Sequence, residues 1–375
     1  MADEIPEPDR IEGAPHPRAT PRLFGHAGAE AAFLDSFNAG RLHHAWMITG
    51  ARGLGKATLA WRIARFLLAT PETEDAGMFS PPPPASLDIP ENHPVARRMR
   101  ALGEPRLFLL RRAWDEKKSR LQDVIAVVEV RKMKSFFALS AADGGRRVAI
   151  IDAVDELNVS AANALLKLLE EPPARVTLLL IAHQPHRLLP TVRSRCRELR
   201  LAALPPPDLA AALAQAGAEV DPHAAQGLTE LAAGSVGQAF RLTDLDGLGL
   251  YERLIGLMAT LPRLSRPRAL ALAEAGAGRD GGVGFDLIVT LIDLMLSRLA
   301  RTGTLGVPPP EAVTGEALLL RRLAPSPAAG RAWADLAQTL SIRARQGKAV
   351  NLDPAALLMD MVLKVDETAG HLANR

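Results

Sequence analysis

The sequence predicts an α/β domain built on a parallel sheet, followed by a region made only of helices. Between residues 45 and 182, short apolar runs of strand length alternate with segments of helical periodicity. This alternation is typical of a parallel sheet covered by helices on both faces. Beyond Gly249 the strand signals disappear and the helices lengthen, notably at 285–299. At 375 residues the chain exceeds the roughly 250 that a single core serves, so we expect two or three domains.

Composition indicates an ordinary intracellular protein. Its hydrophobic content of 48% and charged content of 23% are globular values, and a net charge of +3 permits an acidic partner without requiring one. The single cysteine, Cys196, excludes a disulfide framework and a four-cysteine zinc module, so we expect no metal site, no zinc and a cytoplasmic location. The acidic N-terminus lacks the apolar run of a signal peptide, and no stretch approaches the ~18 apolar residues of a membrane span.

Changes in composition predict where the domains begin and end. Residues 1–21 are rich in proline and alternating charge, which predicts a disordered tail. We expect the α/β core over 22–202, with a surface insertion at 71–94 because the run Pro81–Pro84 forbids a helix or a central strand. Short, alanine-rich helices over 203–246 and the longer helices of 247–375 complete the chain.

Apolar runs and helix-breaking residues predict the individual elements of the core. A helix over 160–170 is expected to stop at the two prolines 172 and 173. Its expected neighbours are strands at 45–48, 107–110, 148–151 and 176–182, and an amphipathic helix over 121–137. Three short helices are expected at 207–217, 221–233 and 235–243.

Residues 50–58 match a phosphate-binding loop at all but one position. They read Gly-Ala-Arg-Gly-Leu-Gly-Lys-Ala-Thr, against the pattern G-x-x-x-x-G-K followed by Ser or Thr, between an expected strand and an expected helix. The glycines Gly50, Gly53 and Gly55 let backbone N–H groups point at an anion, and Lys56 adds a positive charge. These residues predict a cradle that can hold ATP or ADP. The alternative is a tight turn that binds nothing.

The missing position is the one that would hold Mg²⁺. Ala57 stands where a Ser or Thr hydroxyl normally coordinates the ion. Thr58 comes one residue late, about 100° further around the helix, so we interpret it as a capping or packing residue, with recruitment to the nucleotide as the alternative.

Asp152 follows the expected strand 148–151, where phosphate-loop proteins place a carboxylate that orients Mg²⁺. The next residue is Ala153, whereas hydrolysing proteins carry a Glu there. We interpret Asp155 and Glu156 as carboxylates in a first helical turn, favoured by the helix dipole, with displaced catalytic roles as the alternative. The two losses together predict that the chain does not hydrolyse ATP.

Three stretches closely resemble bacterial clamp-loader subunits of the AAA+ family. They are residues 163–173 (Asn-Ala-Leu-Leu-Lys-Leu-Leu-Glu-Glu-Pro-Pro), the triplet Ser194-Arg195-Cys196, and residues 43–46 (His-His-Ala-Trp). The resemblance spans about Leu23 to Arg200. It implies a three-part protein: a phosphate-loop core over 22–202, a helical lid over 203–246 and a helical collar for oligomerisation over 247–375.

The resemblance also implies partners. Subunits of this family form a five-membered ring, here with gamma/tau and delta subunits, that loads the sliding clamp onto primer-template DNA for the DNA polymerase III holoenzyme, a DNA-directed DNA polymerase and nucleotidyltransferase. No stand-alone activity is expected of one such subunit.

Arg195 matches the family's arginine finger, which completes the ATP site of a neighbouring subunit. On composition alone it would be a solvated surface charge. Gly237 stands where motor subunits carry a phosphate-sensing Arg, and His183 where the sensor strand carries Thr or Asn. These departures favour a non-hydrolysing stator. The alternatives are an ATP-hydrolysing motor subunit of the same complex, or a nucleotide-binding scaffold outside replication.

Basic residues are concentrated between positions 111 and 134, without aromatic residues among them. They are Arg111, Arg112, Lys117, Lys118, Arg120, Arg131, Lys132 and Lys134. A solvated helix face is one interpretation, and contact with duplex phosphates is the other.

Overall fold

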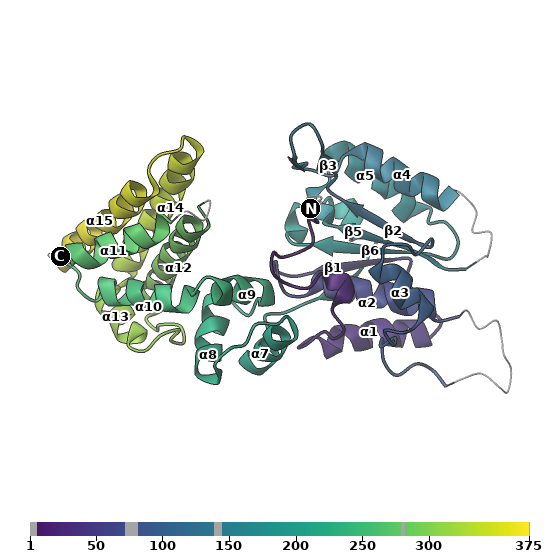
Figure 1. Cartoon of the computed structure of the whole chain (residues 1–375), viewed down its shortest axis with the longest axis horizontal. Helices are drawn as coiled ribbons and strands as arrows, with labels where there is room; N and C mark the ends of the chain where they lie inside the picture. Colours follow the sequence, from purple (N-terminus) through teal and green to yellow (C-terminus); the bar gives the residue numbers. More distant parts are fainter. Residues whose placement is uncertain (1–5, 72–81, 139–144, 279–281, 375) are drawn as a thin grey trace. The chain divides into compact units, whose positions relative to one another are not determined.

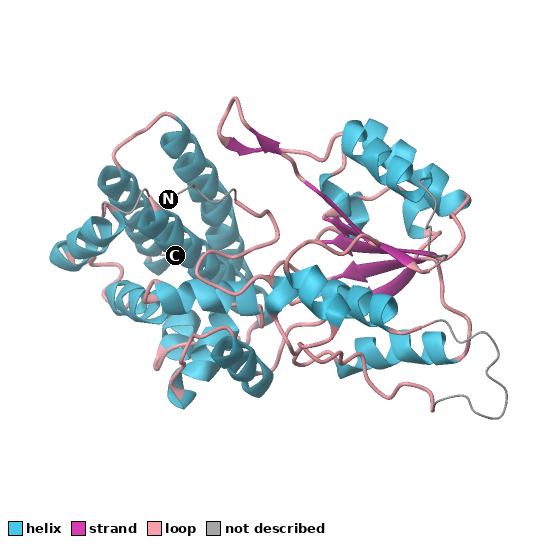
Figure 2. Ribbon diagram, turned by 45° about the vertical axis from the view of Figure 1, so that its right-hand side comes forward, coloured by secondary structure: helices cyan, strands magenta, loops and turns pink. Residues whose placement is uncertain are grey.

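The chain divides into two compact units (Figure 1). The computed structural model describes residues 6–71, 82–138, 145–278 and 282–374, so residues 72–81 of the predicted insertion lie outside the described residues. The N-terminal unit runs to Gly217 and includes Ser235–Gly237, and the C-terminal unit holds Ala218–Gly234 and the chain from Gln238 onward. An α/β unit and an all-helical unit confirm the predicted fold class (Figure 2).

The N-terminal unit is organised by a five-stranded sheet with the strand order β2-β5-β6-β1-β7. All neighbouring strands in it are parallel. The strands are β1 (Ala45–Thr49), β2 (Leu107–Arg111), β5 (Arg147–Asp152), β6 (Val176–Ala182) and β7 (Arg197–Arg200). Every residue of β1 and β6 is buried, as expected for central strands covered on both faces.

Helices cover both faces of this sheet (Figure 1). Residues of α4 and α5 pack with Met47, Ile151 and Leu180 on one face. On the other face α2 packs against β5 and β6, and Trp46 contacts Phe33, which contacts Phe66. Because side chains alternate along a strand, β1 sends Trp46 and Met47 to opposite faces. The helices are α1 (Ala27–Asn38), α2 (Lys56–Ala69), α3 (Pro94–Arg100), α4 (Val127–Ala138), α5 (Val159–Glu170), α6 (Pro190–Arg193) and α7 (Pro206–Gln215), with 3₁₀ turns at Pro17–Ala19, Val154–Glu156 and Pro185–Arg187.

Two parts of this unit differ from the predictions. The helix expected over 121–137 begins only at Val127, because Arg120–Leu121 (β4) pairs with Trp114–Asp115 (β3) in a short antiparallel hairpin. The edge strand β7 was not predicted, since Leu199 is its one buried residue and gives no apolar run.

Residues 7–18 form what we call the N-terminal strap. Glu7 pairs with Arg18 at 2.6 Å and with Arg111 of β2 at 3.1 Å. Asp9 pairs with Arg111 at 2.8 Å and with His16 at 3.1 Å, and the His16 ring meets the buried Trp61 edge-on. The prediction of a disordered tail over 1–21 did not include these contacts.

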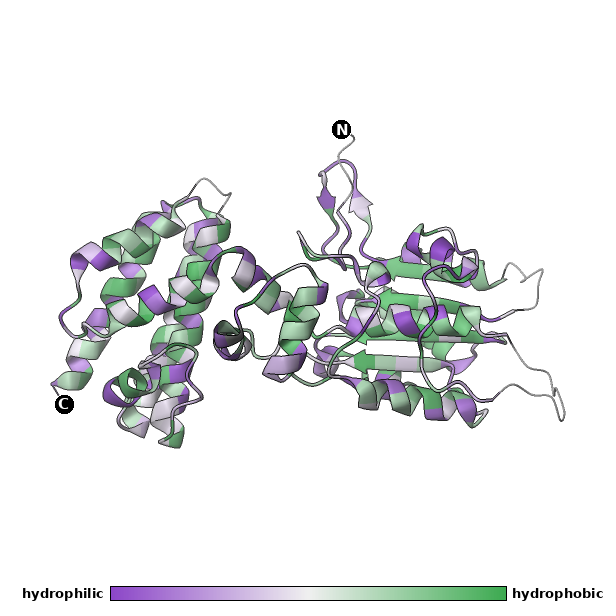
Figure 3. Ribbon diagram, turned by 60° about the horizontal axis from the view of Figure 1, so that its bottom comes forward, coloured by the Kyte–Doolittle hydropathy of each residue, from purple (hydrophilic) through white to green (hydrophobic). Residues whose placement is uncertain are grey.

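The C-terminal unit is entirely helical in its described residues. Its helices are α8 (Pro222–Leu231), α9 (Val236–Asp244, whose first two residues belong to the other unit), α10 (Gly247–Met258), α11 (Arg266–Gly276), α12 (Val283–Leu305), α13 (Glu316–Leu323), α14 (Pro327–Ala349) and α15 (Pro354–Ala373). The long helices α12 and α14 pack at two glycines, since a Cβ on Gly303 would lie 2.7 Å from the Cα of Gly330. Apolar and polar residues alternate around these helices (Figure 3). The predicted boundaries at 202 and 246 stay predictions.

The described helices include none that is long and apolar enough to cross a membrane.

Candidate functional site

The loop at residues 50–58 joins β1 to α2, as the motif requires. Gly50, Gly53 and Gly55 all have positive φ, at 141°, 77° and 91°. A Cβ on Gly50 would lie 2.7 Å from the carbonyl oxygen of Leu201, and one on Gly53 would lie 2.3 Å from the hydroxyl of Ser235. Backbone shape and close packing therefore both require glycine at these positions.

Lys56 is the buried charged residue of the loop, with only 3% of it exposed. Its Nζ donates to the carbonyl oxygens of Gly50 at 2.8 Å and Ala51 at 2.5 Å. Burial lowers its pKa to about 8, against the attraction of Asp152. The ammonium group is thus held at the centre of the loop by the chain's own carbonyls.

The start of α2 offers free donors. Within the described residues, the backbone N–H groups from Gly55 to Thr58 make no hydrogen bond, because they form the first turn of a helix. Such donors, beside a buried ammonium, suit the phosphate groups of a nucleotide. The cradle predicted from Gly50, Gly53, Gly55 and Lys56 is therefore brought together in one place.

The fit to a magnesium ion is poorer. Ala57 has no ligand atom, and Thr58 is 8% exposed on the buried face of α2. Asp152 ends β5, where burial first, and then the negative charges of Asp9 and Glu156, raise its pKa to about 7. No group of three or more His, Cys, Asp or Glu side chains in the described part of the chain is arranged to hold a metal ion.

Asp155 and Glu156 lie in the 3₁₀ turn Val154–Glu156, and each has specific hydrogen-bond or ion-pair partners. Asp155 accepts hydrogen bonds from the backbone N–H groups of His183 at 3.0 Å and Gln184 at 3.1 Å, and so ties the end of β6 to the turn after β5. Glu156 pairs with Arg52 at 2.8 Å and Arg112 at 2.9 Å. Burial, with Lys56 next in effect, lowers the pKa of the His183 imidazole to about 4.

The segment Ser235–Gly237 lies directly on the loop. The backbone N–H of Gly237 donates to the carbonyl oxygen of Gly53 at 3.1 Å, and the Ser235 hydroxyl donates to that of Arg52 at 2.9 Å. Gly237 approaches Gly53 through its bare Cα, which an arginine at this position would prevent.

Arg195 follows the short helix α6 and has a 35% exposed side chain. Its guanidinium pairs with Glu170 at the end of α5 at 2.9 Å and donates to the carbonyl oxygen of Thr191 at 2.9 Å. The structure thus holds Arg195 at the surface. Sequence reasoning missed the role of Glu170, although Glu170 lies inside the 163–173 run that was singled out.

Several residues of the basic 111–134 stretch are engaged within the chain. Arg111 pairs with the strap, Arg112 with Glu156, Arg120 with Asp123 at 3.3 Å, and Lys132 with Glu129 at 2.8 Å. These pairs fit the interpretation as a solvated face.

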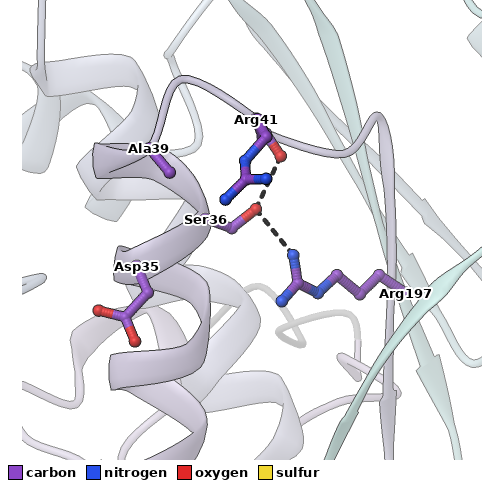
Figure 4. A pocket seen from close by; sticks show the side chains of 5 residues that line it. All are labelled: Asp35, Ser36, Ala39, Arg41 and Arg197. Carbon is purple, nitrogen blue, oxygen red and sulfur yellow. Dashed lines mark hydrogen bonds between the residues drawn. The ribbon is translucent and has the colours of Figure 1, made fainter.

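A surface pocket lies elsewhere on the N-terminal unit, between the end of α1 and the start of β7 (Figure 4). It is lined by Asp35, Ser36, Ala39, Arg41 and Arg197, and none of the predicted site residues lines it. Arg197 donates to the Ser36 hydroxyl at 3.0 Å and lies over the ring of Trp46, which gives it a packing role.

Comparison with known proteins finds relatives of the N-terminal part of the chain. Residues 25–205 match the family model for "DNA polymerase III, delta subunit". The chain is 34% identical to DNA polymerase III subunit delta′ of Pseudomonas aeruginosa, over 62% of this chain and 65% of that protein. It is 32% identical to subunit delta′ of Escherichia coli, over 60% and 61%, and 28% identical to subunit tau of Salmonella typhimurium, over 71% and 39%.

The chain spans less than two thirds of the length of each of these relatives. Among solved structures, a DNA polymerase III gamma-subunit-related protein from Thermotoga maritima matches with a TM-score of 0.38 and 16% identity, over 90% of this chain and 99% of that one, and nothing is inferred from it. These comparisons confirm the predicted resemblance to clamp-loader subunits: residues 25–205 are similar to the family of DNA polymerase III delta subunits.

Proposed function

We propose that this protein is a delta-prime-like subunit of the DNA polymerase III clamp loader, which donates Arg195 to the ATP site of a neighbouring subunit and does not hydrolyse ATP itself. Two features of the N-terminal unit support this proposal together. Arg195 is held at the surface by Glu170, whereas the chain's own loop has Ala57 in place of the hydroxyl that would bind Mg²⁺. A guanidinium at the surface can reach a partner's phosphates, and its fixed fork of donors suits them.

Three further observations support the absence of hydrolysis. Ala153 provides no general base beside Asp152, and Asp155 is committed to two backbone N–H groups of the chain. Thr58, the nearest hydroxyl after Ala57, is buried in the face of α2. The loop would hold nucleotide phosphates through Gly50, Gly53, Gly55 and Lys56 without turning the nucleotide over.

The proposed partners follow from the relatives, which include delta′ and tau subunits of DNA polymerase III. We propose gamma/tau and delta subunits as neighbours in a five-membered ring, with the sliding clamp and primer-template DNA handled by the assembly. The alternative is a motor subunit of the same ring, which the 28% identity to subunit tau keeps as the competing candidate.

The test uses Arg195→Ala with Arg193→Ala as its matched control, since Arg193 is an exposed arginine at the end of α6, two positions before Arg195. In a complex reconstituted with gamma/tau and delta subunits, Arg195→Ala should leave assembly intact. At the one ATP site that it completes, turnover should fall by about 10³-fold, the usual effect of losing an arginine finger. Clamp loading should fall with it, and Arg193→Ala should match the wild type.

Two results would contradict the proposal. Normal turnover and loading with Arg195→Ala would remove the finger role. Magnesium-dependent ATP hydrolysis by the purified chain alone would favour the motor subunit.

A further inference from the structure

The N-terminal strap reaches two groups of the candidate nucleotide site. At one end, Asp9 pairs at 2.8 Å with Arg111 of β2, and Arg111 lies opposite Asp152 of β5 in the sheet. Two residues later, Ile11 packs on the backbone of Gly237, since a Cβ on Gly237 would lie 2.6 Å from the Cδ1 of Ile11. Gly237 in turn donates its backbone N–H to the carbonyl oxygen of Gly53 of the loop at 3.1 Å. The strap thus contacts the segment Ser235–Gly237 that lies on the loop, and it binds the strand beside Asp152.

The strap is held by specific, shielded ion pairs. The Asp9 side chain is 4% exposed, between Arg111 and His16. Glu7 joins Arg18 to Arg111, so one arginine of β2 binds both acids of the strap. Further along, Arg65 of α2 donates to the carbonyl oxygen of Arg18 at 2.6 Å, and Arg62 to that of Pro21. Partly buried pairs of this kind are stronger than exposed ones, because they are less screened.

We propose that the strap is a self-inhibitory cover of the nucleotide site, which must leave Gly237 and Asp152 before a nucleotide binds to the loop. This inference rests on the proposed role of residues 50–58 as a nucleotide cradle, and it is independent of Arg195. Charge gives the first reason: Asp9 adds a carboxylate beside Asp152, and it repels a triphosphate that approaches Lys56.

Packing gives the second reason. Ile11 and Gly53 both lie against Gly237, so a ligand that needs room beside Gly237 and Gly53 has to displace Ile11. A glycine at 237 is what allows this contact, because a side chain at that position would meet Ile11 and Gly53 together. Gly237, which stands where motor subunits carry a phosphate-sensing Arg, is therefore also the residue on which the strap packs.

The test measures ATP binding to the full chain in EDTA and in Mg²⁺, with a fluorescent ATP analogue as probe. The double variant Glu7→Gln/Asp9→Asn removes the acids that anchor the strap, and Ile11→Ala removes its contact with Gly237. Glu12→Gln is the matched control, because Glu12 is an exposed acid of the same segment. Both strap variants should bind the probe at least about tenfold more tightly than the wild type, and Glu12→Gln should bind like the wild type.

A second measurement needs no substitution. Hydrogen exchange in the wild type should show protection at the amides of Arg10 and Ala14, which donate to Glu7 and Ile11, and saturating ATP should remove it. Unchanged affinity in both strap variants, or retained strap protection at saturating ATP, would overturn the inference. A failure of Arg195→Ala to affect the assembled complex would instead contradict the proposed function and leave the strap untouched.

Discussion

Two arginines, one in each unit, show how the surroundings of a guanidinium decide what it can do. Arg298 of α12 has a 7% exposed side chain and binds both carboxylate oxygens of Glu316, at 2.6 and 3.0 Å. Arg195 is 35% exposed and makes a single bond to a carboxylate, that of Glu170. The first arginine is fully committed to its own unit. The second keeps donors available, which is the property that a residue acting on a neighbour needs.

The carboxylate of Glu316 is the centre of the committed site. It also accepts hydrogen bonds from the Tyr251 hydroxyl at 2.6 Å and the backbone N–H of Ala312 at 2.7 Å. The oxygens of this buried group are thereby paired with donors from three separate stretches of the helical unit. A buried charge costs little only while such pairing is complete.

The largest expected effect breaks this buried pair. Glu316→Gln removes the carboxylate that pairs closely with Arg298 and leaves it with Glu230 at 3.9 Å, so the free energy of unfolding should fall by about 3–5 kcal/mol. Chemical denaturation of the full chain measures it. Glu274→Gln, at an exposed acid of α11, is the control and should stay within about 0.5 kcal/mol of the wild type. Equal stability of the two variants would mean that Arg298 is not committed in the way its contacts indicate.

A smaller effect is expected from a substitution of Tyr251. This substitution tests the Tyr251–Glu316 hydrogen bond separately from the Arg298–Glu316 ion pair. Burial and the nearby Glu316 raise the pKa of the Tyr251 hydroxyl, so the hydroxyl keeps its proton and stays a hydrogen-bond donor at every pH at which the protein is folded. Tyr251→Phe removes one hydrogen bond to a charged acceptor while keeping the ring, and should lower the free energy of unfolding by about 1.5–3 kcal/mol. A loss as large as that of Glu316→Gln would show that the hydrogen bond from Tyr251, and not the Arg298–Glu316 charge pair, dominates this site.

The surroundings of Asp152 raise the pKa of its carboxyl group, and the pH dependence of stability tests this shift. Its pKa in the folded chain is about 7 and its ordinary value is 3.8. Between these values the folded state keeps a proton that the unfolded state has released, so stability falls as pH rises through this range. From pH 4 to pH 7 the wild type should lose about 3 kcal/mol more than Asp152→Asn.

His183, whose pKa is lowered to about 4, changes stability in the opposite direction over the same range. It does so in both proteins, so the difference between them isolates Asp152. Asp35→Asn, at an exposed acid, should behave like the wild type throughout. A parallel pH dependence of wild type and Asp152→Asn would contradict the raised pKa.

Sequence reasoning located what depends on local pattern and missed what depends on distant pairs. The strands β1, β5 and β6 are uninterrupted apolar runs, so their positions followed from hydrophobicity alone. The glycines of the loop and Lys56 followed from spacing. The hairpin of β3 and β4 has two residues in each strand and no apolar pattern, so nothing marked it.

The strap and the partner of Arg195 were missed for a different reason. Proline and alternating charge predict disorder because such a segment buries little apolar surface, but Asp9 is held by an arginine 102 positions away. Glu170 and Arg195 are likewise joined only by the fold. A single sequence contains no signal that pairs specific charges over such separations.

The smallest expected effect on stability concerns Glu170, and it completes the comparison. Glu170→Gln removes the only carboxylate on Arg195, but the pair is half exposed, so the free energy of unfolding should change by less than about 1 kcal/mol. In the reconstituted complex the same variant should nevertheless lower ATP turnover, because Arg195 loses the bond that fixes its direction. Glu171→Gln is the matched control, because Glu171 is an exposed acid at the next position, the C-cap of α5. An arginine committed like Arg298 would lose stability and function together when its carboxylate is removed. If Arg195 acts on a neighbour, Glu170→Gln should lose function at nearly unchanged stability, and equal turnover in both variants would show that Glu170 does not position it.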